Sequence, residues 1–177
     1  RQGLERFLSD VDYLCGHNIV HHDVRYLFGD GPCRWQLVDT LYMSPILFPD
    51  RPYHKLLKDD KLISDQANNP VNDCRKAQDL LFDELGCWAR QPEARRQVYA
   101  TLLAGVPEFE GFMRMAGAVP AAGDVAALIH TAYEGCICHH AQLDDICRHQ
   151  PIALAYALSL ISTSDYRSLT PRWVLAN

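Results

Sequence analysis

The stretch that decides the fold reads GHNIVHHD, from Gly16 to Asp23. It continues a short apolar run that contains Leu14 and Cys15, and a helical pattern extends over 20–28. A buried strand that ends in a turn and leads into a helix is the repeating unit of α/β proteins. The stretch therefore predicts a strand, a turn and a helix in that order.

Short strands and helices continue to alternate further along the chain. A second apolar strand is predicted over 35–38, and Asp39 stands where the N-cap of a helix over 41–47 belongs. A lysine-rich helix is predicted over 53–62. Pro70 occupies the natural first-turn position of a long helix, because its fixed φ suits that position. This alternation is typical of an α/β fold.

The pattern changes near residue 90. Beyond it every periodic segment is helical, with Pro92, Pro107 and Pro151 at helix starts. We therefore expect an α/β part over 1–90, followed by an all-α segment over 91–177.

Composition limits the class of protein. The chain has 177 residues, of which 48% are hydrophobic, enough for one sizeable core. Its apolar runs fall short of the ~20 residues that a membrane span needs, and the first residues lack a signal-peptide pattern. The cysteines number seven at irregular spacing, which argues against a disulfide framework. We expect a cytoplasmic protein without membrane contact.

Any contact with nucleic acid must be local. The net charge of −5 excludes an overall basic surface, and affinity for phosphates comes from Lys and Arg. One candidate patch contains Lys55, Lys58 and Lys61. A second group, Arg90, Arg95 and Arg96, is better explained as a solvated helix face.

Two aspartates are candidate metal ligands. Cleavage of a phosphodiester with two divalent ions requires several carboxylates at one point. Asp23 and Asp73 are each placed on the first turn of a predicted helix, where a carboxylate can point into a cleft. The alternative is an ordinary acid that complements the helix dipole.

These residues resemble the DEDD-type 3′–5′ exonuclease family, which has an RNase H-like fold. Gly16 to Asp23 matches the family's second motif, and Val38 to Leu41 resembles the segment that follows it. Asn72 and Asp73, followed by a leucine-rich helix, resemble the third motif. The resemblance implies that Asp23 and Asp73 bind Mg²⁺ or Mn²⁺ and that Asn18 positions the substrate strand or supports the metal site.

A narrower resemblance covers nearly the whole chain. Residues 53–59 and 68–73 are similar to an exonuclease domain fused N-terminal to RecQ-like DNA helicases in bacteria, and the helices after residue 90 resemble the connector between those domains. This implies a DNA repair protein with single-stranded 3′ ends as substrate and a covalently linked helicase. Lys55 and Lys58 would bind the DNA.

The chain departs from the family in two ways. No Asp-x-Glu precedes Asp23, so the first motif, with two of the family's four metal-binding acids, is missing together with the first strands. The positions of the general base hold Asn68 and Asn69, which leaves His54 as the nearest substitute. We therefore expect a partial exonuclease fold that is inactive by itself.

Other interpretations stay open. A nuclease-like module without catalytic activity could guide DNA toward a helicase, or the chain could be an unrelated helical interaction protein. A Cys/His cluster suggests zinc, but its spacing does not fit the usual paired ligands. The cluster comprises Cys136, Cys138, His139, His140, Cys147 and His149.

Overall fold

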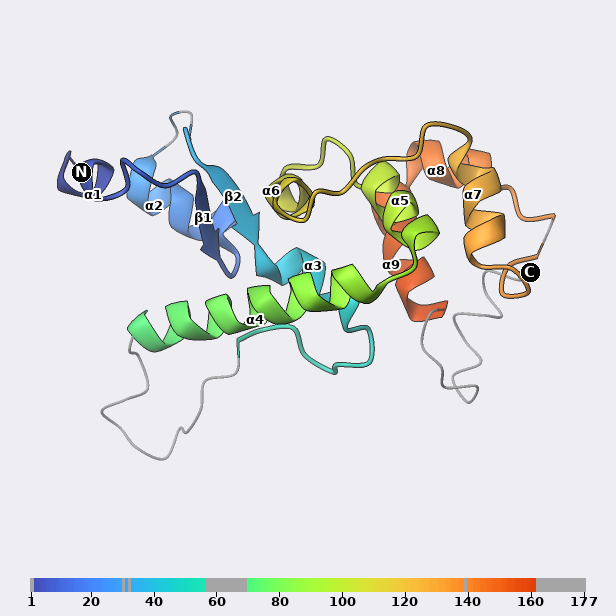
Figure 1. Ribbon diagram of the computed structural model, residues 1–177, viewed down its shortest axis with the longest axis horizontal. Helices are drawn as coiled ribbons and strands as arrows, with labels where there is room; N and C mark the ends of the chain where they lie inside the picture. The colour runs from blue at the N-terminus through green and yellow to red at the C-terminus, as the bar shows by residue number, and fades with distance from the viewer. Residues whose placement is uncertain (1, 30, 32, 57–69, 139, 162–177) are drawn as a thin grey trace.

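The structure, a computed structural model, describes residues 2–29, 31, 33–56, 70–138 and 140–161 (Figure 1). A small sheet lies at one end, and several helices gather at the other. In chain order the elements are α1 (Gln2–Phe7), β1 (Tyr13–Gly16), η1 (Ile19–Asp23), α2 (Val24–Phe28), β2 (Gln36–Asp39), α3 (Thr40–Leu47), α4 (Pro70–Arg90), α5 (Glu93–Leu102), α6 (Pro107–Met115), α7 (Val125–Ala132), α8 (Leu143–His149) and α9 (Pro151–Ile161). The fold is mixed α/β and mostly helical.

The sheet of the described chain has two strands, β1 and β2, which run parallel. Parallel neighbours need a crossover connection, and η1, a single π-helical turn, provides it together with α2. Phe28 at the end of α2 and Trp35 just before β2 are buried, with ring centroids 4.7 Å apart. The predicted order of strand, turn, helix and strand is confirmed.

Helix α3 begins directly after β2. The Asp39 side chain accepts a hydrogen bond from the backbone N–H of Leu41, so the predicted N-cap is confirmed. Met43, Ile46 and Leu47 of this helix are buried, which anchors it in the core.

The prediction of a helix over 53–62 is wrong where the structure describes it. Residues 53–56 are not helical, and residues 57–62 lie outside the described part. Two contacts hold the start of this segment along α3 instead. The Arg51 guanidinium lies 3.9 Å from the centroid of the Phe48 ring, and Ser44 Oγ lies 2.9 Å from His54 Nδ1.

Helix α4 runs along β1 and α3, as its position beneath both in Figure 1 shows. It begins at Pro70, as predicted. Its buried positions are Ala77, Leu81, Glu84 and Trp88, which share one face at helical spacing. A glutamate in this face was not expected from the apolar pattern.

Helices α5 to α9 complete the described part, and α6 lies against β2. A Cβ added at Gly111 of α6 would lie 1.9 Å from the carbonyl oxygen of Leu37, so the helix and strand backbones are in direct contact. One hydrophobic cluster contains Val38 of β2 and Met43 of α3 together with Phe112 of α6 and Leu158 of α9. The helices over the described range thus pack into the core that β2 and α3 begin.

Helix α4 ends at Arg90 and α5 begins at Glu93. The short connection between them lies where the sequence pattern changes. The division into 1–90 and 91–177 stays a prediction. None of the helices over the described ranges is long and apolar enough to cross a membrane.

Candidate functional site

The candidate site lies where the two parallel strands end. Gly16, the last residue of β1, is the register partner of Asp39, the last residue of β2. In open α/β sheets, ligands bind beyond the carboxyl ends of the strands. We call residues 16–23, which follow β1, the strand-end loop.

The Asp39 carboxylate holds the strand-end loop. Asp39 is fully buried, and its Oδ1 accepts hydrogen bonds from the backbone N–H groups of Asn18 at 2.8 Å and Leu41 at 3.0 Å. Its Oδ2 accepts a third from the N–H of Val20 at 3.1 Å. Both oxygens are therefore used, one by the loop alone and one by the loop and α3 together.

Two residues of the motif have conformational reasons for their identity. Asn18 has a φ of 68°, in the left-handed region that asparagine tolerates better than most residues. A Cβ at Gly16 would lie 2.9 Å from the Cβ of Ile19, a distance that real side chains essentially never show. The tight turn of the strand-end loop therefore favours glycine at one position and asparagine at the other.

His17 and His54 lie close together beside the strand ends. His17 Nδ1 is 3.0 Å from Thr40 Oγ1, and burial lowers the pKa of His17, partly opposed by the Asp39 carboxylate. His54 is near enough to affect the pKa of His17. Burial, followed by the nearby Arg51 guanidinium, also lowers the pKa of His54 itself.

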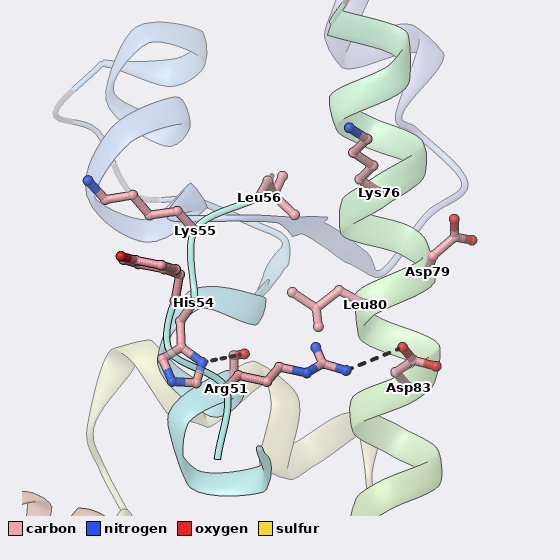
Figure 2. A pocket seen from close by; sticks show the side chains of 10 residues that line it. Arg51, His54, Lys55, Leu56, Lys76, Asp79, Leu80 and Asp83 are labelled. Carbon is pink, nitrogen blue, oxygen red and sulfur yellow. Dashed lines mark hydrogen bonds and ion pairs between the residues drawn. The ribbon is translucent and has the colours of Figure 1, made fainter. Parts of the chain in front are cut away.

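A cavity of about 400 Å³ opens between the segment that carries His54 and helix α4 (Figure 2). In Figure 2, Arg51 extends toward Asp83 on α4, and the guanidinium and carboxylate are 3.9 Å apart. The basic and imidazole side chains that line the cavity are Arg51, His54, Lys55 and Lys76, and its acidic lining residues are Asp79 and Asp83. The predicted residues His54 and Lys55 thus share this cavity, whereas Lys58 lies outside the described residues.

Glu84 is a buried acid that the sequence interpretation missed. It is completely buried on α4, and within the described part of the chain neither of its carboxyl oxygens has a hydrogen-bond partner. Burial, followed by the neighbouring Asp39 carboxylate, raises the pKa of Glu84 to about 9, so it carries its proton at neutral pH. Its position in the same helical face as Leu81 and Trp88 is the signal that could have revealed it.

The two aspartates predicted to bind metal lie on different elements. Asp23 is exposed at the end of η1, and Asp73 is partly exposed in the first turn of α4. No contact found among the described residues joins them, so their shared metal site stays a prediction. His21 of the same loop lies 2.6 Å from Glu108 Oε1 of α6, in agreement with a structural role.

The described ranges hold no group of three or more His, Cys, Asp or Glu side chains placed to bind a metal ion. His139 of the Cys/His cluster lies outside the description.

The chain was compared with known proteins in three ways. No protein-family model, curated protein or solved structure matches it. The function must therefore be argued from the site itself.

Proposed function

We propose that this chain is part of a metal-dependent 3′–5′ exonuclease domain in a cytoplasmic DNA-processing protein, where it is linked to a RecQ-like helicase. The observation that supports the proposal best is the strand-end loop. It starts at the carboxyl end of a parallel strand, turns through a left-handed Asn18 and ends at an exposed Asp23. A partial RNase H-like fold would present the second motif of the exonuclease family in this same order.

In this proposal Asp23 and Asp73 are ligands of Mg²⁺ or Mn²⁺. Hard cations prefer oxygen ligands, and two exposed or partly exposed carboxylates are free to approach an ion. The resemblance requires two more acids, which would come from outside the described residues. When bound, the ions would activate water and stabilise the departing oxygen.

The cavity supports binding of a DNA backbone through an excess of positive charge. Arg51, Lys55 and Lys76 supply this charge, Asp79 and Asp83 offset part of it, and His54 lines the same cavity. Burial and then the Arg51 guanidinium lower the pKa of His54, which favours the neutral imidazole, the form that can accept a proton. His54 is therefore our proposed general base, and Asn18 our proposed contact to the DNA strand. The substrate would be a single-stranded 3′ end.

The test uses the complete parent protein with Mn²⁺ and a 5′-labelled single-stranded DNA. We expect shortening from the 3′ end that Asp23→Ala and Asp73→Ala each reduce by about a thousandfold, as loss of a metal ligand commonly does. The matched control is Asp144→Ala, which removes an exposed first-turn aspartate of α8 in the helical end. Full activity in both site variants would refute the assignment.

A second function is favoured by one observation. Three basic and two acidic side chains line the cavity, which leaves an excess of positive charge, and the described residues hold no group of three His, Cys, Asp or Glu placed to bind a metal ion. A module that only guides DNA toward a helicase would need the positive charge and no metal-binding group. Such a module would bind DNA with a salt-dependent affinity that Lys55→Ala weakens, while the parent protein would show no nuclease activity for Asp23→Ala to abolish.

A further inference from the structure

We infer that Asp39 is a positioning residue. Its two carboxylate oxygens together hold the strand-end loop, which carries Asn18 and Asp23. This inference rests on the proposed function only for its catalytic consequence. The contacts themselves are independent of any activity.

Two backbone N–H groups of the strand-end loop donate to the one carboxylate of Asp39. Asn18 and Val20 point their N–H groups at different oxygens of Asp39, at 2.8 and 3.1 Å. Asp39 itself is fully buried, and Asn18 and Val20 are half-buried. A backbone N–H that loses its partner away from water is costly, which favours the observed loop conformation.

The chain provides an internal comparison in Asp124, the N-cap of α7. There a single oxygen, Oδ1, accepts from the N–H groups of Ala126 at 2.9 Å and Ala127 at 3.3 Å. An asparagine has one carbonyl oxygen and can keep both of these bonds. At Asp39 an asparagine can keep the bonds of only one oxygen, because its amide nitrogen would face an N–H donor.

The second carboxylate oxygen of Asp39 therefore distinguishes two roles, the capping of α3 and the positioning of the strand-end loop. If Asp39 only capped α3, Asp39→Asn would be as mild as Asp124→Asn, because asparagine caps helices as well as aspartate does. If Asp39 positions the loop, Asp39→Asn disturbs Val20 or Asn18 while Asp124→Asn disturbs nothing beyond α7. The two variants make the same chemical change in two settings.

The first experiment records amide ¹H–¹⁵N spectra of the full chain and its two variants. We expect Asp39→Asn to move the amide resonances of Asn18, Val20 and the residues up to Asp23, and Asp124→Asn to leave all of these unchanged. Unchanged loop resonances in a folded Asp39→Asn protein would overturn the inference.

A measurement on the wild-type chain covers the case in which the variant does not fold. Hydrogen exchange at the Asn18 and Val20 amides should be as slow as at Leu41, since all three donate to the same buried carboxylate. Exchange at the rate of an unprotected loop would overturn the inference without any substitution.

The catalytic consequence is measured in the parent protein. We expect Asp39→Asn to lower kcat about tenfold, with KM for DNA nearly unchanged and Asp124→Asn fully active. An active wild type with an equally active Asp39→Asn variant would overturn the positioning role. An inactive wild type would instead refute the proposed nuclease function, and the exchange and resonance data would still decide the role of Asp39.

Discussion

Among the described residues, the end of the molecule that holds β1, β2 and α3, here the strand end, buries more polar side chains than the end formed by α5 to α9, here the helical end. Asp39, Thr40, Ser44 and Glu84 are buried around the strands and the part of α4 beside them, against Ser159 on α9. The helical end buries large apolar side chains such as Phe112, Ile129 and Leu158.

The comparison shows in which part of the chain directional interactions fix the positions of individual atoms. Apolar packing is non-directional and tolerates exchange between residues of similar volume. Buried hydrogen bonds fix the positions of the atoms that make them. The strand end is therefore the part of the chain whose shape is set atom by atom, which is the property that a functional site needs.

The largest effect should arise where the two ends meet, at Gly111. Gly111→Ala places a Cβ 1.9 Å from the Leu37 carbonyl oxygen, so α6 must move away from β2. We expect a loss of more than about 3 kcal/mol in urea unfolding. The control is Gly86→Ala in α4, where the nearest atom is the flexible end of Arg90 at 3.4 Å. That variant should gain about 0.5–1 kcal/mol, because alanine favours helix. A mild effect at Gly111 would show that the ends are separable.

Glu84 should show how the strand end responds to pH. Its pKa is about 9 in the folded chain and near 4.5 when unfolded, so the folded state keeps a proton that the unfolded state releases. Stability that Glu84 contributes is thus lost progressively as pH rises from 4.5 to 9. Glu84→Gln cannot ionise, so its stability relative to wild type should rise by about 2 kcal/mol between pH 5 and pH 6.5 and continue to rise toward pH 8.

Thermal unfolding across this pH range measures the Glu84 effect. Glu134→Gln, which changes an exposed carboxyl in the helical end, serves as the control. A constant difference between Glu84→Gln and wild type would contradict the assignment of a buried, protonated Glu84.

The helical end should depend less on its polar bonds. The Tyr133 hydroxyl donates to the Tyr99 hydroxyl at 3.0 Å within the core. Tyr133→Phe keeps the ring and its packing, so we expect a loss of about 1 kcal/mol in urea unfolding. A loss as large as that of Gly111→Ala would remove the contrast between the two ends.

The smallest effect should come from the bond between His21 and Glu108, which links the strand-end loop to α6. The pair is partly exposed, with side-chain exposures of 53% and 21%. A double-mutant cycle with His21→Gln and Glu108→Gln should give a coupling of about 0.5 kcal/mol that weakens with added salt. A coupling above about 2 kcal/mol would mean that α6 holds the loop as firmly as Asp39 does.

Local sequence signals predicted much of the fold. The apolar run before Gly16, the capping role of Asp39 and the helix starts at Pro70 and Pro107 are all confirmed. Each of these depends on residues within one or two turns of the chain. The helix predicted over 53–62 is wrong over 53–56, where His54 contacts Ser44 instead.

The site was less predictable for a physical reason. Aspartate at a helix start indicates a cap, but the bonds from Asp39 to Asn18 and Val20 join positions far apart in sequence. The burial of Glu84 likewise depends on what covers α4, which no local pattern specifies. Asp23 and Asp73 stay predictions, because their joint role needs groups beyond the described residues.

The direct contact between α6 and β2 also determines how this chain can be divided into fragments. A fragment ending near residue 90 would lack the helix that lies on the backbone around Leu37, and it would leave the apolar surface of Val38 and Met43 facing solvent. Such a fragment would tend to aggregate. Cleavage of the intact chain by a protease between α4 and α5 should instead leave two fragments that remain associated.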